Sequence, residues 1–305
     1  GGSCEPVAIC LPTNCWLEFW KSLKFPIDQA LQDLMVNAGW ENHWLRGLVA
    51  NHERDNDHVL EEHRWMPTEF FRTYIGRSAK RRINAVLDKG WLNEGEQVKL
   101  FEKRLHQVLD LPNVLTTNSC SSSLLLCLLD IGVAGQEVIL PSQTFIATGM
   151  AVLAAGAKPV FADIDPETGN ICLKSLASLI SEKTKAIIPV HWAGNPCDIE
   201  QITSLAFGIP VIQDAAHALG ATINGLSIAH YSDYTCFSFQ SIKHLTTGDG
   251  GAICTPNPNP ALKKMKWFGI DKANIKKDEF GGRLPDVDTF GFKWHMNDLA
   301  AALGL

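Results

Sequence analysis

The stretch Cys236-Phe-Ser-Phe-Gln-Ser-Ile-Lys-His-Leu-Thr-Thr-Gly-Asp-Gly-Gly251 places a single lysine, Lys243, between an apolar, strand-like run and a glycine-rich turn. Upstream, the strand-like run Val211-Ile-Gln-Asp214 ends in a carboxylate. Taken alone, Lys243 could be a surface lysine and Asp214 a helix cap. Together on one rim of a sheet they suit pyridoxal phosphate (PLP). The amine can form a Schiff base with the cofactor aldehyde, and the carboxylate can keep the pyridine nitrogen protonated.

The chain on either side of this stretch alternates between short apolar runs and helical patterns. Such alternation predicts an α/β fold, with a mostly parallel seven-stranded sheet covered by helices on both faces. Ligands of such sheets bind beyond the carboxyl ends of the strands. The candidate strands are Val114–Thr117, Glu137–Leu140, Pro159–Ala162, Ala186–Val190, Pro210–Gln213, Tyr234–Phe237 and Gly251–Cys254.

Small hydroxyl residues follow the first of these strands, in Thr117-Asn-Ser-Cys-Ser-Ser122. At a helix start they offer free N–H groups and hydroxyl donors to a phosphate, although simple helix capping would use the same residues. Ser238 could direct a second hydroxyl to that phosphate. The glycines that follow Lys243 allow a tight turn and a close backbone approach. They do not fit a dinucleotide fingerprint, because they precede a strand instead of opening a helix.

Two rings lie near the predicted strand ends. Phe145 comes just after the second strand, where it could stack on a flat cofactor or belong to the core. His217 follows Asp214 closely and could serve the same site or be an ordinary surface histidine. Each of these residues has a structural explanation by itself, and only their arrangement around Lys243 favours a cofactor site.

Composition narrows the choice of partners. The chain has 305 residues and a net charge of −6, which offers no general attraction to nucleic acid or to anionic membrane. No apolar run approaches the length that spans a bilayer. The nine cysteines are odd in number and lack paired spacing, which favours a reducing compartment and hence the cytoplasm. Cys4, Cys10 and Cys15 cluster without a CxxC pair, so no metal site is predicted.

Residues 1–65 differ in character from the rest of the chain. They hold five of the nine tryptophans, and Trp16 and Trp20, like Trp40 and Trp44, are four residues apart. That spacing places neighbours on one helix face, so we predict a small helical module with an aromatic core, to which no role is assigned. Residues 66–305 are predicted to form the PLP-binding domain.

From about Gly90 to Leu305 the chain resembles the PLP-dependent nucleotide-sugar aminotransferases of the DegT/StrS type, a branch of the fold type I enzymes. The resemblance implies a large domain like that of aspartate aminotransferase. Besides the lysine stretch, its segments are Gly90-Trp-Leu-Asn-Glu-Gly-Glu96, Thr117-Asn-Ser-Cys-Ser-Ser122, Gly149-Met-Ala-Val-Leu-Ala-Ala-Gly-Ala-Lys-Pro-Val-Phe-Ala-Asp-Ile-Asp165, Ile188-Pro-Val-His-Trp-Ala-Gly194, Asp214-Ala-Ala-His-Ala-Leu-Gly-Ala221 and Gly291-Phe-Lys-Trp-His-Met-Asn-Asp-Leu-Ala-Ala-Ala-Leu-Gly304.

By this resemblance Lys243 is the Schiff-base lysine and Asp214 the partner of the pyridine nitrogen. The other implied cofactor contacts are stacking by Phe145, phosphate binding by the Cys120 backbone, Ser121 and Ser238, and a position near the ring hydroxyl for His217.

The family works as homodimers with shared active sites. Many members carry an asparagine that reaches the partner's cofactor phosphate, at the position of Lys293 here. Lys293 could be a cationic substitute for it or a structural lysine on a loop. Family members also continue beyond the position of Leu305 into a smaller domain that closes over the substrate. The present sequence is expected to lack that domain.

The implied activity is a two-stage transamination, of the kind used in polysaccharide biosynthesis. Glutamate would supply the amino group, and a keto group on a nucleotide-linked sugar would receive it, with Lys243 moving the proton. A PLP-dependent sugar dehydratase on the same scaffold is a second hypothesis. Such enzymes replace the lysine with histidine, and Lys243 argues against that. A third hypothesis is a non-catalytic relic, a dimerisation or sugar-binding module, for which neither Lys243 nor Asp214 would be needed.

Overall fold

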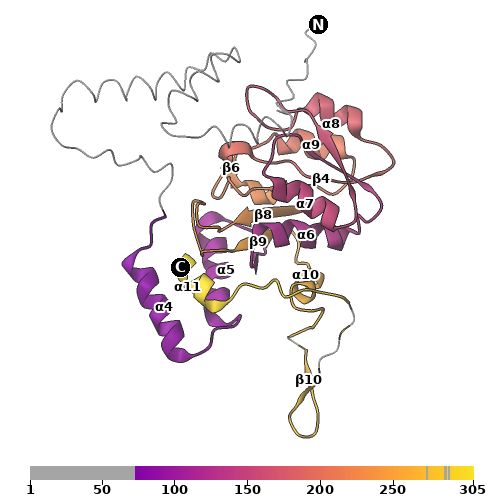
Figure 1. Ribbon diagram of the computed structural model, residues 1–305. Coiled ribbons are helices and arrows are strands. Elements are labelled where there is room, and N and C mark those ends of the chain that lie inside the picture. Colours follow the sequence, from indigo (N-terminus) through magenta and orange to yellow (C-terminus); the bar gives the residue numbers. More distant parts are fainter. Residues whose placement is uncertain (1–72, 273, 285–286, 288) are drawn as a thin grey trace, which may run out of the picture. The chain divides into compact units, whose positions relative to one another are not determined.

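The computed structural model describes residues 73–272, 274–284, 287 and 289–305 (Figure 1). The helical module predicted for residues 1–65, with its three cysteines, lies outside these residues and stays a prediction. No helix in the described ranges is long and apolar enough to cross a membrane. The same ranges contain no group of three or more histidine, cysteine, aspartate or glutamate residues that could hold a metal ion.

A sheet of seven strands organises the molecule, in the order β3-β2-β4-β5-β8-β9-β1. The trio β3-β2-β4 is parallel, and the parallel bridges Ile187–Val211 and Val190–Asp214 join it to β5. β5 pairs with β8 in parallel, and only β9 runs against its neighbours. The predicted α/β fold with a mostly parallel sheet is confirmed. The strands are β1 (Leu115–Thr117), β2 (Glu137–Pro141), β3 (Lys158–Ala162), β4 (Thr184–Ile187), β5 (Ile212–Asp214), β8 (Tyr234–Ser238) and β9 (Gly251–Cys254).

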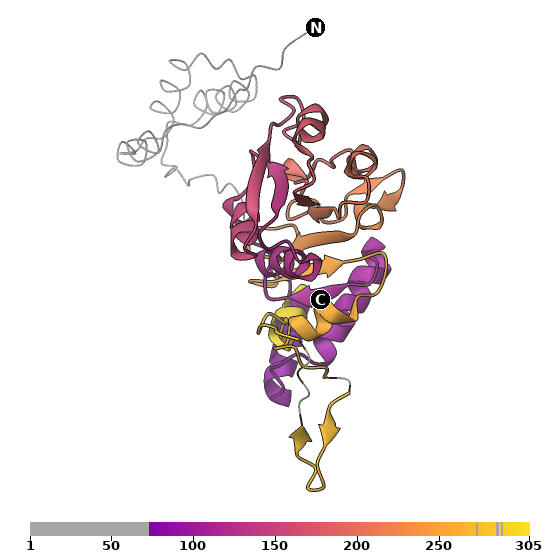
Figure 2. The ribbon, with the colours of Figure 1, turned by 90° about the vertical axis from the view of Figure 1, so that its right-hand side faces the viewer.

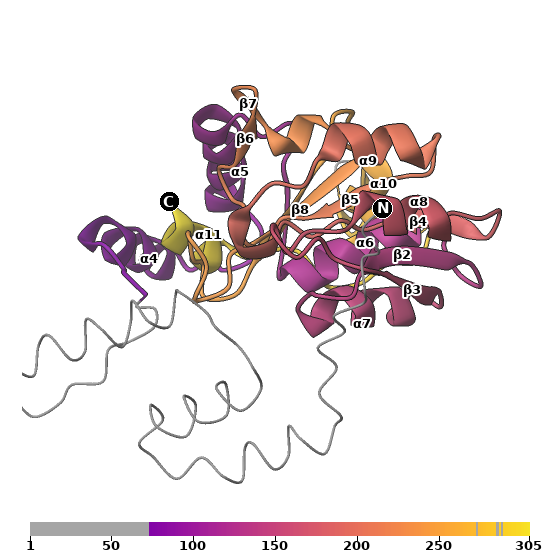
Figure 3. The same ribbon diagram turned by 90° about the horizontal axis from the view of Figure 1, so that it is seen from above.

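Helices cover both faces of this sheet. Figure 3 shows α6 and α7 on one side and α8 and α9 on the other. The core follows the alternation of a strand, because Val138 and Leu140 of β2 pack with α6 while Ile139 packs with α8 and α9. The helices are α4 (Arg77–Lys89), α5 (Glu96–Leu109), α6 (Cys120–Ile131), α7 (Ile146–Ala154), α8 (Leu173–Leu179), α9 (Ile199–Ala206), α10 (Pro260–Met265) and α11 (Asp298–Gly304).

Helix starts use polar caps. The Ser119 hydroxyl accepts a hydrogen bond from the N–H of Ser122 at the start of α6, and Asn297 caps α11 in the same way. The buried Asp298 carboxylate at the start of α11 also accepts bonds from the N–H groups of Gly95 and Val98, which ties α11 to α5. These bonds hold the start of α11 against the start of α5.

Shorter elements complete the fold. A hairpin of β10 (Lys276–Lys277) and β11 (Arg283–Leu284) projects away from the sheet (Figure 2). A second small hairpin and two 3₁₀ turns lie in the connections around β5. They are β6 (Thr222–Ile223), β7 (Leu226–Ser227), η1 (Trp192–Gly194) and η2 (Ile228–His230).

Candidate active site

A cavity of about 520 Å³ opens at the carboxyl ends of the parallel strands. Loops after β1, β2, β4, β5 and β8 line it, as expected for a ligand site in such a sheet. It brings together the two residues on which the PLP hypothesis depends, Lys243 and Asp214. The other predicted contacts that line it are Cys120, Ser121, Phe145, His217 and Ser238.

The start of α6 forms one end of this cavity. Since Ser122 bonds to the Ser119 side chain and Ser123 to the Ser119 carbonyl, the N–H groups of Cys120 and Ser121 find no acceptor in the described part of the chain. Gly251 lies directly against them: a Cβ there would be 2.5 Å from the nitrogen of Cys120. Free N–H groups at the positive end of a helix favour an anion such as phosphate.

Cys120 contributes to this helix start as backbone. Its side chain is buried, and burial raises the pKa of the Cys120 thiol well above its ordinary value. The thiol is therefore neutral, and the N–H group is what Cys120 offers to a ligand. The exposed Ser121 and the buried Ser238 supply hydroxyl groups to the same cavity.

Asp214 is held in place inside the cavity by two donors. Thr148 donates its hydroxyl hydrogen to Oδ2 at 2.7 Å, and the N–H of Ala216 donates to Oδ1 at 3.2 Å. Burial raises the pKa of Asp214, while these two bonds and the positive charge of Lys243 act in the opposite direction. Thr148, fully buried in α7, was not identified from the sequence, because one hydroxyl in the run Ile146–Ala154 gives no pattern.

Lys243 is half-buried on the loop after β8. Its N–H bonds to the Gln240 carbonyl at 2.9 Å, which closes the loop over the cavity. Burial lowers the pKa of the Lys243 amine, and Asp214 partly offsets that effect. A lysine with a lowered pKa is more often neutral, as a nucleophile or a general base must be.

His217 is affected by the charge of Lys243 and contacts an aromatic ring. Burial, and then the charge of Lys243, lower the pKa of His217. The ring of Trp192 meets it edge-on, with the ring centroids 6.0 Å apart. Gly194, with φ of +87°, passes so close that a Cβ there would lie 2.7 Å from the His217 carbonyl oxygen. The His-Trp-Ala-Gly segment after β4 is thus packed directly onto His217.

A buried polar network that begins at His191, in the lining of the cavity, was not identified from the sequence either. The N–H of Cys197 donates to Nδ1 of His191, so Nε2 carries the hydrogen and donates to Oε1 of Gln213 at 2.8 Å. The Gln213 amide donates in turn to the hydroxyls of Ser232 and Thr235. Burial lowers the pKa of His191 to about 4, so this histidine is neutral at pH 7. The network fixes the end of β4 against β5.

Lys293 does not line the cavity. It is exposed, and its backbone pairs with Trp267 in an isolated antiparallel bridge. The described part of one chain therefore provides no contact between Lys293 and the other predicted site residues, and its role across a dimer stays a prediction.

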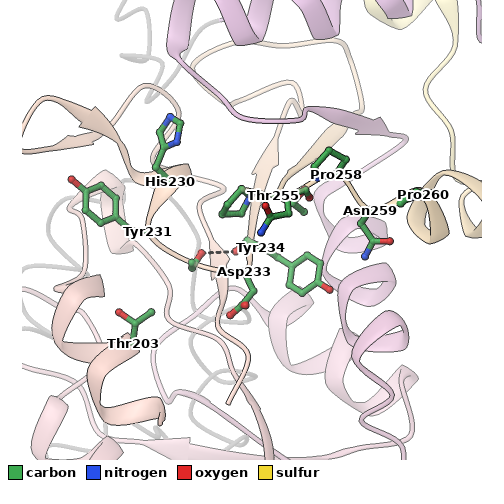
Figure 4. A pocket seen from close by; sticks show the side chains of 12 residues that line it. Thr203, His230, Tyr231, Asp233, Tyr234, Thr255, Pro258, Asn259 and Pro260 are labelled. Atoms are coloured by element: carbon green, nitrogen blue, oxygen red, sulfur yellow. Dashed lines mark hydrogen bonds between the residues drawn. The ribbon is translucent and has the colours of Figure 1, made fainter. Parts of the chain in front are cut away.

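A second hollow, of about 530 Å³, lies at the opposite ends of the strands (Figure 4). No lysine lines it, and several of its polar side chains are hydrogen-bonded to the protein. Asp233 accepts from the N–H of Val211 at 2.9 Å, Tyr234 donates to Asp130 at 2.6 Å, and Tyr231 donates to the Ile223 carbonyl at 2.8 Å. Its similar volume does not make it an equal candidate, because no lysine in its lining could form a Schiff base.

Comparison with known proteins agrees with this geometry. The chain is 36% identical over 237 residues to the spore coat polysaccharide biosynthesis protein SpsC of Bacillus subtilis, covering 76% of this chain and 61% of SpsC. The sugar aminotransferase CalS13 of Micromonospora echinospora matches with a TM-score of 0.72 and 30% identity, over 78% of this chain and 67% of CalS13. The PLP form of the putative sugar aminotransferase Spr1654 of Streptococcus pneumoniae matches with a TM-score of 0.70 and 30% identity, over 78% and 65%.

The chain thus spans less than two thirds of the length of the curated relative SpsC. A family model matches residues 73–305, which includes the whole described domain. On this match and these identities, the chain belongs to the DegT/DnrJ/EryC1/StrS aminotransferase family.

Proposed function

We propose that residues 66–305 form the large domain of a PLP-dependent aminotransferase that transfers an amino group, with glutamate as donor, to a keto group on a nucleotide-linked sugar. The observation that carries the proposal is the shared cavity of Lys243 and Asp214, with the free N–H groups of α6 at its end. The similar structure of DesI supports the substrate class, since it was analysed in the presence of its TDP-sugar product. It matches with a TM-score of 0.65 and 33% identity, over 76% of this chain and 58% of DesI.

The residues of the cavity fit PLP in charge and shape. The start of α6, Ser121 and Ser238 would hold the phosphate, and Gly251 leaves the room that a side chain would fill. Phe145, which is 71% exposed, offers a free ring for stacking, and Asp214 would face the pyridine nitrogen. When bound, PLP supplies an electron sink for the pair released at the substrate carbon.

The protein's own chemistry centres on Lys243. As a base, the Lys243 amine would take a proton from the glutamate carbon that bears the amino group. As an acid, it would later deliver a proton to the sugar carbon that receives the amino group. Both roles need an amine that changes its charge easily, and burial lowers the pKa of Lys243 in that direction. Thr148 and Ala216 orient the Asp214 carboxylate and favour its ionised form, which the pairing with a protonated ring nitrogen requires.

The proposal includes a homodimer in the cytoplasm. The exposed Lys293 would reach the phosphate site of the partner subunit, where a cation would add to the helix N–H groups. A dehydratase is less well supported, because Lys243 is present. A relic that binds no cofactor would not need a buried carboxylate held by two donors beside a lysine of lowered pKa.

The absorbance of the protein tests whether it binds PLP at Lys243. The purified chain, incubated with PLP, should absorb in the near-ultraviolet and visible region, and borohydride should fix the cofactor on the peptide that contains Lys243, as seen by mass spectrometry. Lys243→Ala should take up PLP without that covalent bond and should transfer no amino group from glutamate to a keto-sugar nucleotide. A colourless chain, or PLP fixed on another lysine, would refute the assignment.

A further inference from the structure

Trp192 is an aromatic side chain of the cavity that the proposed cofactor contacts do not use. It lies in η1, half-buried, and lines the cavity together with Phe145, His217 and Lys243. Its ring meets His217 edge-on at a centroid distance of 6.0 Å. The indole therefore forms a wall of the cavity on the side of His217.

The protein holds this indole in a defined position. Gly169 has φ of +71°, and a Cβ there would lie 2.7 Å from Cδ1 of Trp192, so the absence of a side chain makes room for the ring. The buried Asn170 accepts from the N–H of Trp192 at 3.0 Å and donates to the Asn195 carbonyl at 3.1 Å. Both flanks of η1 are thus bound to the turn around Gly169.

The proposed reaction decides which part of the substrate meets this wall. The reacting carbon must come within reach of the Lys243 amine, so the sugar ring enters the cavity while the nucleotide extends away from it. Phe145 is the ring proposed for cofactor stacking, which leaves Trp192 for the substrate. A large, rigid indole packs well on the C–H face of a pyranose, whose hydroxyl groups can then point to polar neighbours.

We propose that the Trp192 indole is a specificity-determining contact for the sugar ring of the nucleotide-linked substrate. This inference rests on the function proposed above and extends it to a named wall of the site. It implies that Trp192 contributes to binding of the sugar and little to binding of PLP or glutamate, which carry no pyranose ring.

Fluorine NMR tests the contact directly. The PLP-loaded chain is labelled with 5-fluorotryptophan, and the Trp192 signal is assigned by its absence in Trp192→Phe. UDP-, TDP- and GDP-glucose are then added, each beside its nucleotide alone, and binding is followed in parallel by calorimetry. We expect the Trp192 signal to shift with a nucleotide hexose and to stay in place with the bare nucleotide.

Variants test the energetic contribution. Trp192→Ala should weaken binding of the nucleotide hexose by about 10- to 100-fold, and Trp192→Phe by less, because part of the apolar contact is kept. The absorbance of bound PLP and the KM for glutamate should stay within about twofold of the wild-type values, which shows that the variants fold. The matched control is Trp91→Phe, an exposed tryptophan outside the lining of the cavity, which should change none of these values.

The contact with Gly169 gives a second test. Gly169→Ala should displace the indole and weaken hexose binding in the wild-type background, and should have little further effect in Trp192→Leu, so the two losses do not add. Three results would each overturn the Trp192 proposal and leave the proposed function intact. They are hexose binding without a shift of the Trp192 signal, equal shifts with the bare nucleotide, and losses of affinity that add. Absence of both PLP colour and nucleotide-hexose binding would overturn the proposed function, and this inference with it.

Discussion

The Thr148 hydroxyl donates a 2.7 Å hydrogen bond to the Asp214 carboxylate, although the two residues lie 66 positions apart in the sequence. Thr148 also bonds to Thr144, which lines the same cavity, at 2.7 Å. Asp214 is therefore oriented by the first turn of α7, the helix that begins directly after Phe145. The ring proposed for stacking and the carboxylate proposed for the pyridine nitrogen are positioned by one short segment.

Replacing Thr148 tests this coupling. Thr148→Val keeps the shape but leaves the buried Asp214 without one donor, so the pKa of the carboxyl should rise further and its ionised form should become scarcer. We expect PLP to bind about 10- to 100-fold more weakly, measured by titration of the absorbance of the bound cofactor. Thr203→Val, in α9 and outside the cavity, is the control. Equal PLP affinity in Thr148→Val and wild type would show that the bond is not needed.

Gly251 allows close packing at the phosphate end of the cavity. It pairs with both Thr117 and Ser238, and a Cβ would lie 2.5 Å from the Cys120 nitrogen. Gly251→Ala must push β9 and α6 apart, so we expect about 2–4 kcal/mol lower stability in urea and loss of phosphate binding by calorimetry. Gly149→Ala is the matched control, since its Cβ would only meet Leu140 at 3.9 Å; it should be neutral or stabilising. A fully stable Gly251→Ala would contradict the geometry.

Subunit mixing tests whether Lys293 acts across a dimer. Lys243→Ala lacks the covalent cofactor site, and Lys293→Ala should bind PLP more weakly because the phosphate loses a cation. A mixed dimer would contain one site with Lys243 from one chain and Lys293 from the other. In a co-refolded one-to-one mixture, about half of the dimers are mixed, and one of the two sites in each is complete. The amount of PLP that binds with high affinity and is fixed by borohydride should therefore reach about a quarter of the wild-type amount. Mixtures that equal the average of the two separate variants would exclude sharing of the site.

The strands could be found from the sequence because both faces of a parallel sheet are buried and each strand is a short apolar run. The predicted Tyr234–Phe237 and Gly251–Cys254 match β8 and β9 within one residue. The least accurate case is Ala186–Val190, where the structure has Thr184–Ile187. Past Ile187 the apolar run keeps one hydrogen bond to β2, from the N–H of Ile188 to the Ile139 carbonyl, and one isolated bridge to β5, Val190–Asp214. The apolar sequence therefore extends beyond the regular ladder.

The sequence could predict only those site residues whose reactive groups lie at or just after the end of a predicted strand. Asp214 ends β5 and Lys243 lies on the loop that follows the neighbouring parallel strand β8, so the topology brings both to one cavity. Neither Thr148 nor His191 was predicted as a site residue, because each acts through a partner that is distant in sequence. That partner is Asp214 for Thr148 and Gln213 for His191. The role of Gly169, which makes room for Trp192, could likewise be seen only once the chain was folded.

His191 predicts how stability depends on pH. Its pKa is about 4 in the folded chain and 6.5 without the burial, so the unfolded chain binds a proton first as the pH falls. The contribution of neutral His191 to the free energy of unfolding is therefore complete above about pH 6.5 and is lost as the pH falls toward 4. The loss amounts to about 3 kcal/mol. His191→Asn should be less stable at pH 7 in urea, but its stability should fall less between pH 6.5 and 4. Thr235→Val removes a hydroxyl of the same network and no titratable group, so it should keep the wild-type slope. An unchanged slope in His191→Asn would show that the buried network does not control acid stability.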